Sequence, residues 1–462
     1  MKRKNPLLMV VGTVVTLAVT GLFATMTWSY VKWNQGKPLT TLEPQGPNAV
    51  SIANLVTPVF VIGMVVFVAV PAVIFFIIWR FRDTGDEETA DVMPAQLHGK
   101  TTAEIAWTIA PALVLLVVAL LTVVTLGELN AAPKPDALHV KVEGQQWWWK
   151  FSYDLTDYKG VEPAAKDRVY TDTEDIATAN ELVIPTGVEI ALSETSNDVI
   201  HSFWIPALNG KKDAVPGMTT DWKLQANTPG VYRGQCTEFC GLSHANMRML
   251  VRAVSPADFA KWKANQLLPA AKPADGSLEA AGQAVFKGQL CASCHLIRGV
   301  NDAQVVDPKS GVKMQLVSGV APDLTHFASR GTFAGSIFNS RYPSPPASEN
   351  QPFGQTCRVN NEKGSGLDAN GNPIDEAKLE LCPAANQPDT LKIPFASTPG
   401  NPDNPPNRTA LAEWLRDPPK NKPMSPLPEE NPNAGGRRRG MPNLKLTEDQ
   451  ITQLVAYLNS LK

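Results

Sequence analysis

The sequence predicts a multidomain membrane protein in which N-terminal transmembrane helices precede an all-β sandwich and an all-α domain. Three observations predict this class. Two long apolar runs lie before residue 130, short β-type runs separated by turn residues continue to about residue 254, and amphipathic helical patterns occur near the C-terminal end. A chain of 462 residues is long enough for two or three domains.

The composition excludes some partners and indicates a compartment. Lys and Arg number 42 against 44 Asp and Glu, so the net charge of −2 gives no reason to expect nucleic-acid binding. The proline count of 39 is high and the glycine count of 32 is ordinary, which indicates long loops and linkers. The six cysteines fall into three pairs (236/240, 291/294 and 357/382), which favours a periplasmic or extracellular location for most of the chain.

Residues 1–54 contain a first apolar segment, from Pro6 to about Tyr30, that follows a basic stretch at residues 2–4. This pattern is typical either of a cleaved signal peptide or of a retained helix with its N-terminus inside. The apolar run is longer than a usual signal sequence, and no small-x-small cleavage site is evident. We expect a retained helix, with cleavage as the alternative.

Residues 55–126 predict a transmembrane helical hairpin. At about 1.5 Å per residue, Leu55–Trp79 and Ala103–Leu126 would each span more than ~35 Å as a helix, enough to cross a bilayer. Counted on Lys and Arg alone, the connecting loop reads as cytoplasmic. Everything after Gly127 is therefore expected on the outer face.

Residues 127–265 predict the β-sandwich. Thr-Gly and Pro-Gly turns separate short β-type runs at Ala137–Glu143, Glu181–Pro185, Val188–Ser193, Thr219–Leu224 and Met249–Val254. Several short strands with turns between them are typical of a sandwich or barrel.

A cluster of metal-ligating residues follows the turn at residues 229–230. Cys236 and Cys240 are four residues apart, and His244 and Met247 come soon after. Thiolate, imidazole and thioether are the soft ligands that select copper, and a single-copper site needs one Cys, two His and one Met. The extra thiolate predicts that two copper ions share both cysteines, with His201, at the end of a β-type run, as the second histidine. The alternative for the cysteine pair is a structural disulfide.

Three motifs resemble subunit II of the haem–copper cytochrome c oxidases. They are H-x(34)-C-x-E-x-C-x3-H-x2-M, the E-x-x-W-T-x-x-P of the second span, and G-Q-Q-W-W-W-K-F-S-Y at 144–153. The resemblance covers roughly residues 50–260. It implies a dinuclear copper centre, CuA, in a cupredoxin-like domain behind a two-helix hairpin.

The resemblance also implies the ligands, which are His201, Cys236, Glu238, Cys240, His244 and Met247. In the family pattern both cysteines bridge the two ions. His201 and Met247 complete one ligand set, and His244 with the backbone carbonyl of Glu238 completes the other. The Glu238 side chain would reach a magnesium ion at the contact with subunit I.

Other positions match family residues outside the copper set. Trp147 matches an exposed tryptophan at which electrons enter, and Glu104 matches the carboxylate at the mouth of a proton-uptake channel. From the residues alone, Glu104 would be an interfacial cap, and three adjacent tryptophans would be strand packing or an interfacial belt. Asp198 and Asp213 match acidic positions near the subunit I contact. Met218 stands where mitochondrial relatives have arginine.

A Pro/Ala linker at 266–276 leads to a second candidate site in residues 277–462. C-x-x-C-H is the signature of covalent c-type haem attachment, so Cys291 and Cys294 would bind the haem and His295 would be its proximal ligand.

Two amphipathic helices are expected around this motif. Ser277–Leu290 would turn Gly282 and Phe286 toward Glu448–Leu461, a helix that Thr447 caps. The helix pair around a haem resembles class I cytochrome c.

The remaining features of this region concern the sixth haem ligand and an insertion. Met441, in Met-Pro-Asn-Leu, matches the family better than Met424 does, and His326 is expected to be structural. Residues 338–407 form a Pro/Asn/Gly-rich insertion whose two cysteines (357/382) favour a disulfide.

Together the resemblances imply subunit II of a caa-type, proton-pumping terminal oxidase in a bacterial plasma (inner) membrane, multi-pass, with the copper and haem domains on the periplasmic face. Electrons would pass from haem c to CuA and on to haem a of subunit I, which reduces oxygen. The implied partners are subunit I with its CuB, subunit III, membrane lipids, and cytochrome c or a cytochrome bc-type complex as donor. The alternatives are a quinol oxidase subunit II, which lacks copper ligands, and a copper-delivery protein.

Overall fold

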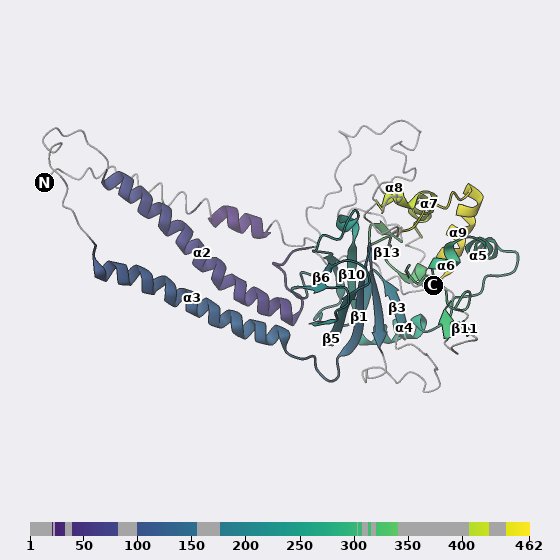
Figure 1. The fold of residues 1–462 in the computed structure, drawn as a ribbon, viewed down its shortest axis with the longest axis horizontal. Helices are drawn as coiled ribbons and strands as arrows, with labels where there is room; N and C mark the ends of the chain where they lie inside the picture. Colours follow the sequence, from purple (N-terminus) through teal and green to yellow (C-terminus); the bar gives the residue numbers. More distant parts are fainter. Residues whose placement is uncertain are drawn as a thin grey trace, which may run out of the picture. The chain divides into compact units, whose positions relative to one another are not determined.

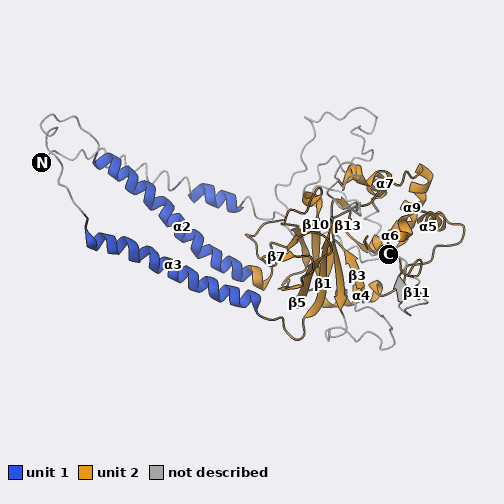
Figure 2. Ribbon diagram, in the orientation of Figure 1, with its two compact units in different colours: residues 1–35, 50–131 blue, residues 36–49, 132–462 orange. Residues whose placement is uncertain are grey.

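The computed structural model of this chain describes residues 21, 24–32, 39–81, 99–154, 176–302, 304–306, 313–315, 320–340, 406–424 and 440–462. The chain divides into two compact units, residues 1–35 with 50–131 and residues 36–49 with 132–462 (Figure 2). Most of the first apolar segment lies outside the described residues, although residues 24–32 are helical. Most of the 338–407 insertion, including its cysteine pair, also lies outside them.

The first unit contains the predicted hairpin helices, α2 (Pro47–Arg80) and α3 (Thr101–Asn130). Both extend beyond the predicted spans at each end. Their apolar side chains are exposed rather than packed inside the unit, with Val65 at 63% and Leu115 at 66% exposure. By length and composition both helices can cross a membrane, where lipid would cover these side chains.

The β-rich part of the second unit contains two sheets and a hairpin (Figure 1). The first sheet has the order β3-β2-β1-β5-β8, with β1 Leu138–Gln145, β2 Trp148–Asp154, β3 Ile176–Ala179, β5 Ile190–Ser196 and β8 Thr220–Leu224. The second has the order β4-β10-β9, with β4 Glu181–Pro185, β10 Arg248–Val254 and β9 Gly230–Gln235. The hairpin pairs β6 (His201–Trp204) with β7 (Lys211–Ala214). The predicted sandwich is confirmed.

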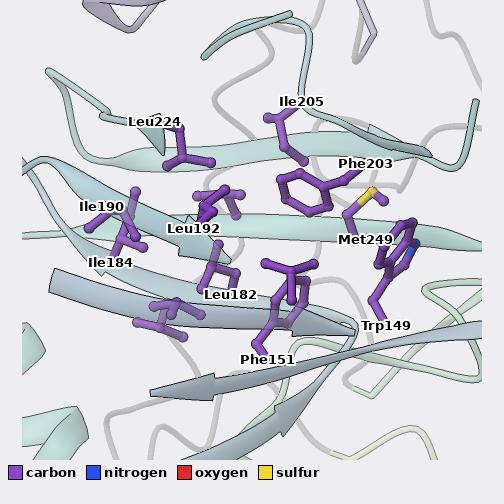
Figure 3. Close-up of a cluster of buried hydrophobic side chains, with 14 of the residues drawn as sticks. Trp149, Phe151, Leu182, Ile184, Ile190, Leu192, Phe203, Ile205, Leu224 and Met249 are labelled. Atoms are coloured by element: carbon purple, nitrogen blue, oxygen red, sulfur yellow. The ribbon is translucent and has the colours of Figure 1, made fainter. Parts of the chain in front are cut away.

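Side chains from both sheets fill one interior (Figure 3). Trp149 and Phe151, two apart on β2, point to the same side because side chains alternate along a strand. They meet Leu182 of β4 and Phe203 of β6, and the Trp149 and Phe203 rings are 5.5 Å apart at 75°. Burying each such side chain stabilises the fold by roughly 1.5–3 kcal/mol.

The prediction of the strands was incomplete. The five expected runs became β1, β4, β5, β8 and β10, and only β4 has the predicted bounds. Strands β2, β3, β6, β7 and β9 were not among the runs singled out, although strand packing was one interpretation of the three tryptophans that include the start of β2. His201 begins β6 instead of ending a β-type run, so its position is set by the hairpin with β7.

The C-terminal part of the second unit is mainly helical. Its helices are α4 Pro256–Gln266, α5 Leu278–Gly288, α6 Cys291–Cys294, η3 Phe327–Ser329, α7 Arg408–Arg416, α8 Pro418–Asn421 and α9 Glu448–Ser460. Helix α5 begins after Ser277, whose side chain accepts a hydrogen bond from the Ala280 amide. Helix α9 begins with a full capping box between Thr447 and Gln450, which agrees with the predicted cap.

Helices α5 and α9 pack tightly against each other, as the sequence predicted. A Cβ atom placed on Gly282 would lie 2.6 Å from the Cβ of Tyr457, so only glycine permits this approach. One turn further along α5, Phe286 is buried with its ring 6.1 Å from that of Tyr457.

The expectation of an all-α C-terminal domain is wrong in one respect. Two short antiparallel ladders interrupt the helices, β11 (Gln304–Val306) with β12 (Lys313–Gln315) and β13 (Thr332–Phe333) with β14 (Phe338–Asn339). Two- and three-residue strands carry too weak a periodic signal to be read from sequence.

Candidate metal centre and adjoining cavity

The ligand loop is held by two adjacent strands. It leaves β9 after Gln235 and rejoins the sheet at Arg248, the residue that pairs with Gln235. The Cys236 amide donates to the Met247 carbonyl at 3.0 Å, which closes the loop at its base. Between them lies a short 3-10 turn, η2 (His244–Asn246). The loop therefore presents its donor atoms from a rigid support.

The sulfur and nitrogen donors converge at the end of the sandwich. The two Sγ atoms are 3.9 Å apart, and Cys236 Sγ lies 3.9 Å from His201 Nδ1. Cys240 Sγ lies 3.5 Å from His244 Nδ1 and 3.7 Å from Met247 Sδ. A disulfide needs about 2.05 Å between the sulfurs, so the disulfide alternative is wrong for this structure. A metal ion lies about 2.0–2.3 Å from each nitrogen or sulfur ligand. Donor atoms separated by 3.5–3.9 Å therefore leave room for metal ions between them.

The Glu238 carbonyl also belongs to this cluster. Its oxygen lies 3.3 Å from Cys236 Sγ, whereas the Glu238 side chain is exposed. Cys236, Cys240, Met247 and His201 are almost fully buried. The six residues that the sequence proposed as copper ligands are thus brought together, although they come from two separate segments.

The two thiols ionise unequally because they share a hydrogen bond. The hydrogen bond shared with Cys240, reinforced by His201, lowers the pKa of Cys236 against the opposing effect of burial. The same contact, together with burial, raises the pKa of Cys240. A bound metal cation deprotonates a coordinating thiol outright, so a cation between the sulfurs would permit both to be thiolates.

Asp198 orients the histidine that comes from outside the loop. Its Oδ1 lies 2.9 Å from His201 Nε2, which leaves Nδ1 directed toward Cys236. Burial alone would lower the pKa of His201, but the hydrogen bonds to Asp198 and Cys236 raise it overall. A carboxylate behind a ligating imidazole fixes its tautomer and ring orientation. The sequence placed Asp198 only near a subunit contact, and its spacing of three residues before His201 was the available signal.

The segment before β2 is bonded to the ligand loop. Gln146 Nε2 and Trp147 Nε1 both donate to the Cys240 carbonyl, at 2.8 and 2.9 Å, and the peptide bond between the two residues is cis. The exposure expected of Trp147 is wrong, because its side chain is only 4% exposed. A C-terminal residue contacts the backbone here, since Lys422 Nζ donates to the Trp147 carbonyl.

A cavity of about 590 Å³ lies between the sandwich and the C-terminal helices of the second unit. The sandwich contributes residues 145–148 and 179–180 to its wall, and the C-terminal part contributes residues that include Cys291, Cys294 and His295. Cofactor pockets commonly have volumes of about 300–1,000 Å³. The cavity therefore places the C-x-x-C-H motif and Trp147 around the same space.

The residues of the motif have features that suit haem binding. His295 Nδ1 lies 2.8 Å from the Pro322 carbonyl, which leaves Nε2 available as a ligand. Burial lowers the pKa of His295, which favours the neutral imidazole that binds a metal. Cys291 and Cys294 are free thiols. Because the donor set and the cavity match, these residues fit a covalent haem.

Both candidate methionines line this cavity, but they pack differently. Met441 packs against the core of the helical part, whereas Met424 packs against the core of the sandwich. This packing favours Met441 over Met424 as the sixth ligand of a haem bound through His295.

The other proposed residues are not members of the donor cluster. Asp213 is exposed on β7, and Met218 is 57% exposed. Glu104 is exposed in the first turn of α3, in the other unit. His326 is hydrogen-bonded on both ring nitrogens, to the carbonyls of Lys462 and Leu268 at 2.7 and 2.9 Å, as a structural histidine would be.

Sequence reasoning missed three residues beside the site. Lys422 is buried and donates to the Trp147 carbonyl, Ser243 donates to the Pro423 carbonyl, and Gly335 approaches the loop backbone. Each contact joins positions far apart in the chain, so no local pattern signals it.

Two helices that can cross a membrane precede a β-sandwich, and an end loop of that sandwich and strand β6 together supply the cysteine, histidine and methionine donors. These features define a cupredoxin-like membrane protein. Comparison with known proteins gives the family. Residues 138–254 match "Cytochrome C oxidase subunit II, periplasmic domain", and residues 39–124 match "Cytochrome C oxidase subunit II, transmembrane domain".

Individual relatives agree with these matches. Cytochrome c oxidase subunit 2 of Alkalihalophilus pseudofirmus is 31% identical over 309 residues, covering 65% of this chain and 79% of that protein. The Bacillus subtilis protein of the same name is 33% identical over 315 residues, covering 65% and 80%. The chain is also similar to the crystal structure of the periplasmic domain of subunit II of cytochrome oxidase of Bradyrhizobium japonicum, at 32% identity over 29% of this chain and 96% of that one, with a TM-score of 0.24.

The chain therefore belongs to the cytochrome c oxidase subunit II family, whose members are subunits of an oxidoreductase complex. The family implies a CuA copper centre, and the clustered donors of His201, Cys236 and Cys240 fit one.

Proposed function

We propose that this chain is subunit II of a caa-type terminal oxidase and passes electrons from its own haem c to CuA and on to haem a of subunit I, where oxygen is reduced and protons are pumped. The observation that carries the proposal is the shared cavity. Trp147 lines the same space as Cys291, Cys294 and His295, and its indole donates to the carbonyl of Cys240.

The donor set favours electron transfer over catalysis at copper. Catalytic metal sites keep an open coordination position for substrate. Here six protein donors are available, and the cysteines and methionine among them are almost fully buried. Two bridging thiolates would share one electron between both ions, so the loop would change little on reduction. The hydrogen bond that closes the loop at Met247 supports such rigidity.

The helical part supplies the groups that a c-type haem needs. Cys291 and Cys294 would form the thioether bonds, His295 the proximal bond and Met441 the sixth bond. Bound haem would act as a one-electron carrier. Arg330 is a buried cation in the cavity wall, and its charge would stabilise the anionic propionate groups of the haem.

The remaining parts of the proposal concern the membrane and the partners. Helices α2 and α3 would cross a bacterial plasma membrane and leave the second unit on the periplasmic side, with cytochrome c or a cytochrome bc-type complex as donor and subunits I and III as neighbours. Glu104 would lie at the mouth of a proton channel. The exposed Glu238 side chain would be free to reach a magnesium ion at subunit I.

Metal and haem analysis of the purified chain tests the proposal. We expect two copper ions and one covalent haem per chain, a mixed-valence copper EPR signal and a c-type optical spectrum. One labile copper and no dinuclear signal would instead support a copper-delivery protein. A chain that binds neither copper nor haem would support the quinol oxidase alternative.

A further inference from the structure

Two segments of the C-terminal part contact the sandwich beside the ligand loop. In the first segment, Lys422 Nζ donates to the Trp147 carbonyl and Pro423 accepts a hydrogen bond from Ser243. Ser243 is fully buried and directly precedes the proposed ligand His244. The next residue, Met424, packs against the core of the sandwich.

The second segment approaches the loop through glycine backbone. Gly335 has φ +78°, and a Cβ atom there would lie 2.6 Å from the Asn246 carbonyl oxygen. Its own carbonyl accepts from the Arg248 amide at 3.3 Å. In the same segment the Gly331 amide donates to Glu181 Oε2 at 2.8 Å. Any side chain at position 335 would separate the two surfaces.

Both segments meet at Lys422. Its Nζ donates to the Trp147 carbonyl on the sandwich and lies 3.4 Å from the Ala334 carbonyl on the second segment. The side chain is almost fully buried, and among the residues that the structure describes no carboxylate forms an ion pair with it. Backbone carbonyls of two separate segments therefore hold this amine in place.

We propose that residues 331–335 and 422–424 form a clamp between the C-terminal part and the sandwich. The clamp holds the cavity-lining C-terminal part against the sandwich at the point where Trp147 is hydrogen-bonded to Cys240, and Lys422 is its positioning residue. The inference rests on the proposed function. Electron transfer from the haem to the copper pair would then need no docking event. Because Trp147 is buried, an external electron donor would have to deliver its electron to the haem. The transfer moves one electron from the haem to the copper pair and makes or breaks no bond.

The test uses the full chain loaded with copper and haem. We expect wild-type transfer from photoreduced haem to copper to be independent of solvent viscosity. Lys422→Met removes the hydrogen bonds of a charged donor. This loss should lower the equilibrium constant for docking of the two parts by about tenfold or more. In this variant we expect slower, viscosity-dependent transfer and faster hydrogen exchange of the Gly331 and Arg248 amides, with unchanged copper and haem spectra. The matched control is Lys420→Met, an exposed lysine two residues away, which should change nothing.

A second pair of variants tests the clamp without touching the amine. Gly335→Ala should give the same slow, viscosity-dependent transfer. Gly276→Ala places alanine at a similar positive φ (+75°) with no atom within 4 Å, so it should leave transfer unchanged. Wild-type rates and exchange in both Lys422→Met and Gly335→Ala, or viscosity-dependent transfer in the wild type, would overturn the clamp. A wild-type chain that lacks haem or dinuclear copper would instead overturn the proposed function.

Discussion

The ligand loop and the cavity proposed to hold haem are built in opposite ways. Five of the six proposed copper ligands lie within residues 236–247, between two paired strands, and only His201 comes from elsewhere. The cavity instead combines residues 145–148 and 179–180 of the sandwich with segments around 286–295, 320–335, 411–424 and 440–458. A local loop depends on a few short-range bonds, whereas a composite cavity depends on the packing of its whole surroundings. Mutations should therefore have all-or-none effects in the loop and graded effects around the cavity.

The largest effect is expected in the loop. Cys240→Ser removes one bridging thiolate and should abolish dinuclear copper while leaving the haem spectrum intact. Copper content and EPR measure the first outcome, and the optical spectrum measures the second. Two copper ions with a normal mixed-valence signal in this variant would contradict the assignment of Cys240 as a bridging ligand.

The next effect tests the cavity. Met441→Leu should remove the sixth ligand, weaken the low-spin haem signature and lower the haem potential, because a thioether ligand raises it. Met424→Leu is the matched control, since that residue packs against the sandwich core, and it should leave the haem spectrum unchanged. The reverse result would assign the ligand to Met424.

A smaller effect is expected behind the loop. Asp198→Ala leaves the copper donors in place but removes the carboxylate that holds His201 Nε2 at 2.9 Å. Loss of such a partner typically lowers metal affinity by roughly 10–100-fold. Competition with a copper chelator measures the change. Asp213→Ala, which alters an exposed carboxylate outside the donor cluster, should keep wild-type affinity.

The smallest effect concerns the helix pair that supports the cavity. Gly282→Ala forces a methyl group against α9 and should destabilise the helical part by about 1–3 kcal/mol. Gly288→Ala, on the same helix with no atom within 4 Å, should not destabilise it. Denaturant unfolding followed by circular dichroism compares the two variants. Equal free energies of unfolding would mean that the methyl group at position 282 does not weaken the packing of α5 against α9.

The sequence predicted what depends on nearby residues. The apolar hairpin, the cap at Thr447 and the donor spacing of the loop are all local patterns, and the structure contains them. It did not predict β6 or β7, nor that Trp147 would be buried, because these depend on pairing and packing with distant segments. The role of Asp198 was missed for a simpler reason, since its matched position pointed to a subunit contact rather than to His201.

The mixed origin of the cavity wall has a consequence for biogenesis. Attachment of the proposed haem would need access to both Cys291 and Cys294, yet residues 145–148 line one side of the same cavity. We therefore expect maturation to follow an order, with the thioether bonds made before the C-terminal part settles on the sandwich. Slow labelling of these two thiols by an alkylating reagent in a haem-free, docked chain, and fast labelling in Gly335→Ala, would show that docking restricts this access; equal rates would contradict it.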